Sequence, residues 1–170
     1  MRLVTFSDDK GTRIGVHDAG SATIVDLAAS TRLPKEMTAF VALGRKGLTR
    51  ARKAVKSGEG RLPLAGVKLL APFPRPAKNI LCVGKNYHDH AKEFHNSGFD
   101  ASAGASAIPE VPIMFTKWPN SVIGPGVAIP SANDYTNSVD YEGELTVVMG
   151  EGGRNITQKN AYKHVYGYTI

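Results

Sequence analysis

The chain has 170 residues, of which 42% are hydrophobic and 21% are charged, and its formal net charge is +6. These proportions favour a soluble globular protein of one ordinary domain, or of a small domain with part of a second, and argue against intrinsic disorder. No apolar run approaches the roughly 18 residues that cross a bilayer, no secretory signal is visible, and the single cysteine, Cys82, cannot form an internal disulfide, so we expect a cytoplasmic protein without a membrane partner.

The first 72 residues predict a small α+β domain that begins with strands. Three β-prone runs lie at residues 2–6, 12–16 and 22–26, and turn residues such as Asp and Gly separate them. Short β-prone runs joined by such turns are typical of antiparallel neighbours. The pattern therefore predicts a three-stranded meander.

Two helices are predicted to follow the meander. Pro34 suits the first turn of a helix that ends near Gly44, and a second helix is expected over residues 48–56. Six basic residues and no acidic one fall in the window that includes this second helix: Arg45, Lys46, Arg50, Arg52, Lys53 and Lys56. This basic stretch is either a solvated helix face or a phosphate-binding surface. Because it contains no aromatic residue that could stack on a base, we predict no nucleic-acid partner.

A proline-rich segment separates this domain from a second one. Residues 72–76 contain three prolines, which exclude a helix or a central strand, so we place the boundary between residues 72 and 73. The second domain, residues 73–170, is predicted to be rich in strands. The expected strands are residues 80–83, 112–116, 144–149 and 165–170, the expected helix is residues 87–95, and a loop of small residues covers 96–107.

The acidic sequence Asp140-Tyr141-Glu142-Gly143-Glu144 is the first candidate for chemistry. On a strand, Glu142 and Glu144 would point to the same side, about 7 Å apart. Two carboxylates aimed at one place repel each other unless a cation lies between them, and Mg²⁺ prefers oxygen ligands. The same spacing is also compatible with an exposed acidic strand face, because an E-x-E pair is a weak motif by itself.

The second candidate is the histidine-rich segment around His90. On a helix over residues 87–95, His90 and Glu93 are three positions apart and share a face, so the carboxylate can orient the imidazole and raise its basicity. Such a pair can activate water, but a surface pair on an amphipathic turn has the same spacing. Zinc is not expected, because His88 and His90 diverge on a helix and the H-E-x-x-H spacing is absent.

Two other side chains have two possible roles each. Cys82 lies in an apolar strand-like run, where a buried structural thiol is expected rather than a nucleophile. Lys117 follows a predicted strand and faces either a site or solvent. The phosphate-binding motifs and the G-x-S-x-G elbow of serine hydrolases are absent from the sequence, so nucleotide-binding and serine-hydrolase functions are not expected.

Five motifs follow one another through the second domain. They are K-N-I-L-C-V-G-K-N-Y at residues 78–87, H-A-K-E at 90–93, P-I-M-F-T-K at 112–117, D-Y-E-G-E-L at 140–145 and G-Y-T-I at 167–170. In this order they resemble the fumarylacetoacetate hydrolase family, which includes acylpyruvases, fumarylpyruvate hydrolases and hydroxymuconate-type isomerases and decarboxylases. Residues 1–72 resemble the smaller N-terminal domain of the longer bacterial members.

The resemblance implies a fold, a cofactor and a set of site residues. The implied fold is a strand-rich α+β protein in which a mixed β-sandwich or β-roll catalytic domain, usually dimeric, holds Mg²⁺ or Mn²⁺. By resemblance, the metal ligands are Glu142 and Glu144, the catalytic dyad is His90 and Glu93, and the substrate-binding residues are Lys117, Tyr87 and Lys85.

The activity implied by the resemblance is hydrolysis of a C–C bond in a 1,3-dioxo or 2-oxo acid, such as an acylpyruvate or fumarylpyruvate, through a metal-stabilised enolate. Such enzymes act in the catabolism of aromatic compounds. The alternatives are a 2-oxo acid decarboxylase, a hydroxymuconate-type isomerase, and an inactive fragment or binding module of the same fold. In the family a third acidic ligand follows the G-Y-T-I strand, so we expect that ligand beyond Ile170 and expect residues 1–170 alone to be inactive.

Overall fold

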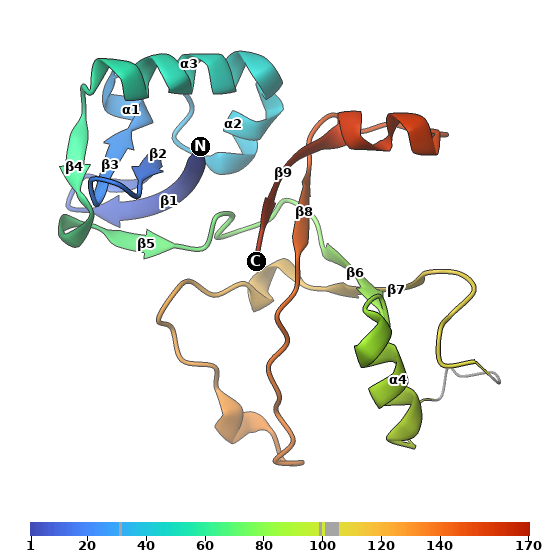
Figure 1. Ribbon diagram of the computed structural model, residues 1–170. Coiled ribbons are helices and arrows are strands. Elements are labelled where there is room, and N and C mark those ends of the chain that lie inside the picture. Colours follow the sequence, from blue (N-terminus) through green and yellow to red (C-terminus); the bar gives the residue numbers. More distant parts are fainter. Residues whose placement is uncertain (31, 99, 101–105) are drawn as a thin grey trace. The chain divides into compact units, whose positions relative to one another are not determined.

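Figure 1 shows a computed structural model of the chain, which describes residues 1–30, 32–98, 100 and 106–170. The structure consists of two units. The first unit is Met1–Pro74 together with Ile123–Ile170, and the second unit is Arg75–Val122. Part of the loop expected over residues 96–107 lies outside the described residues. The division into domains between residues 72 and 73 stays a prediction.

The first unit is built on a five-stranded sheet. Its strands are β1 (Arg2–Asp8), β2 (Gly11–Asp18), β3 (Thr23–Asp26), β4 (Arg61–Pro63) and β5 (Lys68–Leu70). The order across the sheet is β4-β3-β2-β1-β5, and every neighbouring pair is antiparallel. Strands β1, β2 and β3 form a meander at the positions where the sequence predicts three strands. Gly11, which begins β2, has a φ of +91°, a conformation that glycine adopts without steric cost.

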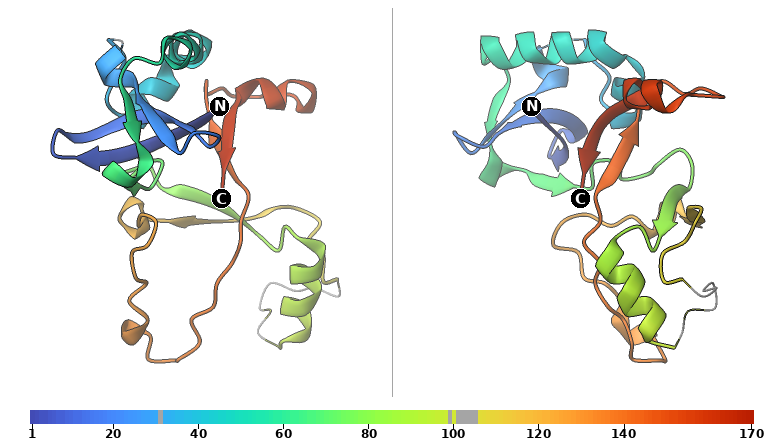
Figure 2. Two further views of the ribbon diagram at one scale, coloured as in Figure 1. Left: turned by 60° about the vertical axis from the view of Figure 1, so that its left-hand side comes forward. Right: turned by 45° about the vertical axis from the view of Figure 1, so that its right-hand side comes forward.

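Three helices pack on this sheet, namely α1 (Leu27–Ser30), α2 (Met37–Ala42) and α3 (Gly44–Ser57). Figures 1 and 2 show α3 lying across one face of the sheet. The core between sheet and helices contains Ile14, Val16, Val25, Leu27, Leu33, Met37, Phe40, Ala51 and Ala54. Helix α3 begins earlier than predicted, at Gly44 instead of Leu48. Gly47 is buried against α2, and an added Cβ there would lie 3.0 Å from the Cβ of Leu43, so this glycine permits close packing.

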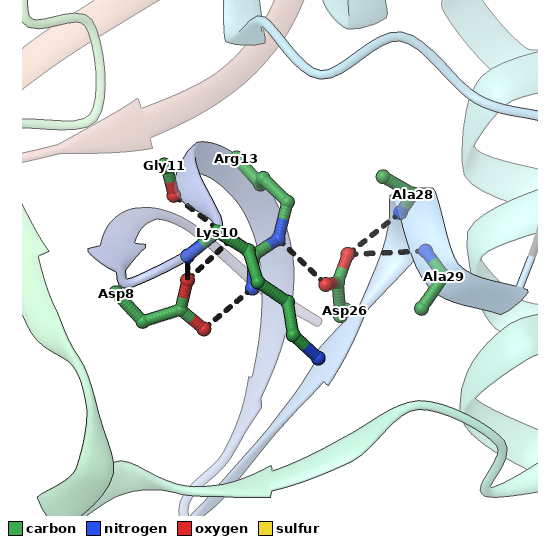
Figure 3. Close-up of polar contacts among 7 residues, drawn as sticks. All are labelled: Asp8, Lys10, Gly11, Arg13, Asp26, Ala28 and Ala29. Atoms are coloured by element: carbon green, nitrogen blue, oxygen red, sulfur yellow. Dashed lines mark hydrogen bonds and ion pairs between the residues drawn. The ribbon is translucent and has the colours of Figure 1, made fainter.

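A buried guanidinium connects β1, β2 and the start of α1 (Figure 3). Arg13 is 4% exposed. Its Nη1 and Nη2 donate to the carboxylate of Asp8 at 2.6 and 2.7 Å, and its Nε donates to Oδ2 of Asp26 at 2.7 Å. The other oxygen of Asp26 accepts hydrogen bonds from the backbone N–H groups of Ala28 and Ala29, so Asp26 also caps α1. The hydrogen bond from Arg13 lowers the pKa of Asp8 to about 2.

The C-terminal part of the first unit is a two-stranded ribbon. Strand β8 (Thr146–Met149) pairs antiparallel with β9 (Val165–Thr169), with an irregularity between Val148 and Met149. The 3₁₀ segment Gln158–His164 leads directly into β9. Tyr166 of β9 packs against the core of the N-terminal sheet and helices. The expected strand over residues 144–149 is thus shorter than predicted, because it begins at Thr146.

The second unit contains a hairpin-like pair of strands and one helix. Strand β6 (Ile80–Gly84) pairs antiparallel with β7 (Ile113–Lys117), and α4 (His88–Asn96) lies between them in the chain. These three elements lie within one residue of their predicted bounds. No helix among the described residues is both long and apolar enough to cross a membrane.

Candidate active site

Helix α4 presents the predicted catalytic pair to solvent. Tyr87, the residue before the helix, is extended with φ −97° and ψ 131°, and the first helical residue is His88. His90 and Glu93 are both exposed and share a face of the helix. Within the described part of the chain, no hydrogen bond or ion pair joins their side chains, and the His90 ring centroid lies 6.2 Å from that of Phe94. The helix is observed, and the dyad itself stays a prediction.

The predicted substrate-binding residues of this unit differ in exposure. Lys117 is the last residue of β7, pairs in register with Ile80, and is exposed. Tyr87 is exposed at the start of α4. Lys85, in contrast, is buried, and its Nζ lies 2.5 Å from Oδ2 of Asp100. Two of the three residues are therefore exposed, whereas the third is buried in an ion pair.

A cavity of about 270 Å³ lies beside α4 within the second unit. The turn after β6, helix α4 and the segment 108–112 supply its walls. Lys85, Asn86, His88 and Glu110 are its polar and charged lining side chains. Lys117, His90 and Glu93 do not line it, so this cavity and the exposed face of α4 are separate features.

Glu142 and Glu144 precede β8 in a stretch without regular secondary structure. The argument that strand alternation points both carboxylates to one side therefore does not apply, and this part of the prediction was wrong. The physical reason is the exposed surroundings of the stretch, where a Cβ added to Gly143 would meet nothing within 4 Å. A strand needs a paired neighbour to fix its pleat, and the paired part begins at Thr146.

The two carboxylates suit a hard divalent cation by their chemistry. Both are exposed, and among the described residues neither makes a hydrogen bond or an ion pair with another side chain. Asp140 nearby differs, because its Oδ1 accepts a hydrogen bond from the backbone N–H of Tyr141 at 2.8 Å. No cluster of three or more His, Cys, Asp or Glu side chains in the described ranges is arranged to hold a metal ion. Glu142 and Glu144 thus fit two positions of a Mg²⁺ or Mn²⁺ site, whose other positions need further ligands or water.

The predicted residues fall into two sets that belong to different units. His90, Glu93, Tyr87, Lys85 and Lys117 lie in Arg75–Val122, which brings them into one small unit. Glu142 and Glu144 lie in the unit that ends with Ile123–Ile170. The first set is carried by β6, α4 and β7, and the second by the stretch that leads into β8.

Sequence reasoning missed Asp100 and its contacts with Lys85 and His95. Oδ2 of Asp100 contacts Nζ of Lys85 and lies 3.5 Å from Nδ1 of His95. The side chains of Lys85 and Asp100 are 5% and 3% exposed. Nothing in the sequence around Asp100, which lies next to the loop of small residues, indicates that its side chain is buried. The spacing of 15 residues between Lys85 and Asp100 matches no helix or strand period.

Comparison with known proteins shows what this chain is similar to. Residues 79–170 match the family model "Fumarylacetoacetate (FAA) hydrolase C-terminal". Over 146 residues the chain is 42% identical to oxaloacetate tautomerase YisK of Bacillus subtilis, which covers 81% of this chain and 46% of that protein.

Two solved structures share the fold over nearly the whole chain. Fumarylacetoacetate hydrolase from psychrophilic Exiguobacterium antarcticum is 35% identical with a TM-score of 0.71, covering 99% of this chain and 53% of its own. Maleylpyruvate hydrolase from Sphingobium sp. SYK-6, in complex with manganese(II) and pyruvate, is 26% identical with a TM-score of 0.67. The match covers 99% of this chain and 56% of the hydrolase chain.

The chain spans about half the length of the relatives that it matches. The family model covers residues 79–170, which is more than half of the chain, and the mixed, strand-rich fold agrees with the solved structures. The chain belongs to the fumarylacetoacetate hydrolase family.

Proposed function

We propose that this chain forms part of a divalent-metal-dependent enzyme that interconverts the keto and enol forms of oxaloacetate. The observation that carries the proposal is the exposed face of α4, which His90 and Glu93 share and on which neither makes a hydrogen bond or an ion pair with another side chain among the described residues. The 42% identity to an oxaloacetate tautomerase supports this reaction over others of the family.

The residues of α4 supply the proton transfer. The His90 imidazole accepts a proton from the carbon next to the ketone of oxaloacetate, and the imidazolium returns that proton to the ketone oxygen to give the enol. The Glu93 carboxylate accepts a hydrogen bond from the ring N–H, which holds the ring in one orientation and stabilises its charged form. The ammonium of Lys117 and the hydroxyl of Tyr87, both exposed, bind the substrate carboxylates.

Glu142 and Glu144 are the proposed ligands for Mg²⁺ or Mn²⁺, with a third acidic ligand expected beyond Ile170. A cation held by these carboxylates would act as a Lewis acid toward the ketone of the substrate and would make the C–H bond next to that ketone easier to ionise. The similarity to a structure of maleylpyruvate hydrolase that holds manganese and pyruvate supports this assignment.

Hydrolysis of an acylpyruvate or fumarylpyruvate is the second candidate, supported by the similarity to two hydrolase structures. In that reaction His90 deprotonates a water molecule, which attacks the distal carbonyl, and the C–C bond breaks to leave an enolate. Both reactions use the same base, so the choice between them depends on whether water is held next to the substrate. A homodimer, a cytoplasmic location and a role in aromatic catabolism stay predictions.

The test uses the product of the complete reading frame that contains residues 1–170. Enol oxaloacetate is added, and the decay of its ultraviolet absorbance is followed with Mg²⁺, with Mn²⁺ and after chelation. We expect acceleration with metal and its loss after chelation. Pyruvate release from acylpyruvates is measured in parallel with lactate dehydrogenase. Release of pyruvate without tautomerisation would replace the first candidate function with the second. The absence of both activities would contradict both candidate functions.

A further inference from the structure

A buried ion pair closes the segment that carries α4. Nζ of Lys85 lies 2.5 Å from Oδ2 of Asp100, and the two side chains are 5% and 3% exposed. The residues are 15 positions apart, and the whole of α4 lies between them in the chain. The pair therefore forms a noncovalent cross-link between the turn after β6 and the segment after α4.

One face of α4 lies toward this ion pair. The ring centroid of Phe94 is 6.0 Å from the ammonium, and Nδ1 of His95 is 3.5 Å from the carboxylate oxygen. Ala91 is buried and lies three and four positions before these two residues, on the same helix face. His90 and Glu93 are exposed. The orientation of the inner face thus determines where the two candidate catalytic side chains project.

The backbone of Lys85 adds an independent observation. Its φ is +54°, in the left-handed region that residues with a Cβ rarely adopt. A residue keeps such a conformation only where its surroundings hold it there. The turn that holds it leads, three residues later, into α4, so the conformation of Lys85 and the start of the helix are coupled.

We propose that Lys85 and Asp100 are positioning residues whose ion pair fixes the orientation of α4 and thereby of His90. The inference rests on the proposed function for the role of His90 as the base. The competing role for Lys85 is binding of a substrate carboxylate, because its side chain lines the cavity beside α4. An ammonium that is already buried against a carboxylate has little charge to offer a second anion, which favours the positioning role.

The first measurement needs no substrate. Amide hydrogen exchange in α4 is compared among wild type, Lys85→Met, Asp100→Asn and the double variant. Lys92→Met is the matched control, since Lys92 is an exposed lysine of α4 that has no ion-pair partner in the described part of the chain. Each single substitution breaks the buried ion pair, so we expect exchange in α4 to become about tenfold faster. The double variant should lie closer to wild type than either single variant.

The second measurement separates positioning from substrate binding. On the product of the complete reading frame, kcat and KM are determined for oxaloacetate. Misplacement of the base lowers kcat about 10- to 100-fold in both single variants with little change in KM, and the double variant recovers part of the loss.

A raised KM in Lys85→Met alone, with Asp100→Asn like wild type, would overturn the positioning role, as would unchanged α4 exchange in both single variants. If wild type itself shows no turnover, the proposed function fails, and the exchange experiment still decides whether the ion pair fixes α4.

Discussion

Replacing Asp26 by alanine removes two interactions of the cluster in Figure 3 at once. One is the 2.7 Å hydrogen bond from Nε of Arg13, and the other is the cap formed with the N–H groups of Ala28 and Ala29 at 2.8 and 3.2 Å. A buried hydrogen bond between charged groups contributes about 1.5–3 kcal/mol, and an N-cap contributes about 1 kcal/mol. We therefore expect Asp26→Ala to lower the free energy of unfolding by about 3 kcal/mol.

The assay is equilibrium unfolding in urea together with thermal unfolding. For a chain of this size a loss of 1 kcal/mol lowers Tm by about 2–4 °C, so Asp26→Ala should lower it by about 6–12 °C. Asp26→Asn keeps an oxygen that can cap α1 but loses the charge, so it should lose about 2 kcal/mol.

The control is Asp18→Ala, which removes an ion pair with Arg61 in which the side chains are 40% and 34% exposed. Exposed pairs contribute little, so this variant should be close to wild type. The reasoning is refuted if Asp26→Ala is no less stable than Asp18→Ala, or if Asp26→Asn is as unstable as Asp26→Ala.

Three further predictions concern pH, metal and charge. Because the Arg13 hydrogen bond holds the pKa of Asp8 at about 2 instead of 3.8, the contribution of this carboxylate to stability is complete above about pH 5 and is lost as the pH falls through about 2. Urea titrations of Asp8→Asn should show a flatter pH dependence there, and an unchanged slope would contradict this. In the full-length product, His90→Ala should lower kcat by about 10²- to 10⁴-fold and leave the Mn²⁺ affinity nearly intact. Glu142→Ala should lose both turnover and Mn²⁺ binding. If His90→Ala lost Mn²⁺ binding as much as Glu142→Ala does, these roles would be contradicted. In a gel-shift assay at two salt concentrations we expect no complex with nucleic acid, and a salt-sensitive complex would indicate that α3 binds phosphates.

Sequence patterns predicted the elements whose residues carry their own period or turn signals. The apolar run of β6 and the helical spacing around His90 gave bounds within one residue of those observed. Strands β4 and β5 have three residues each, too few to show a period of two, and they are strands because they pair with β3 and β1 at the two edges of the sheet. Their formation depends on tertiary pairing, which no local pattern reports.

One glycine misled the prediction because it serves packing. The second helix was expected to begin at Leu48, yet α3 begins at Gly44 and includes Gly47. Gly47 allows the backbones of α2 and α3 to approach, because any larger residue would meet Leu43 and Phe40. The Lys85–Asp100 pair could not be predicted from the sequence. Its two residues are 15 positions apart in the chain and do not belong to one element, so no spacing within an element indicates the contact.

The two sets of candidate site residues are held in different ways, and this difference has a kinetic consequence. His90 and Glu93 project from a helix on which Ala91 is buried and which lies in the chain between the ion-paired Lys85 and Asp100, so the proposed positioning role implies that their direction is set before a ligand binds. Glu142 and Glu144 lie on an exposed stretch around Gly143, where packing does not fix the backbone. Holding a cation there requires ordering that stretch, and the conformational entropy lost on ordering reduces the affinity for the ion. Changes in the stretch before β8 should therefore appear first in metal affinity, whereas changes beneath α4 should appear first in kcat.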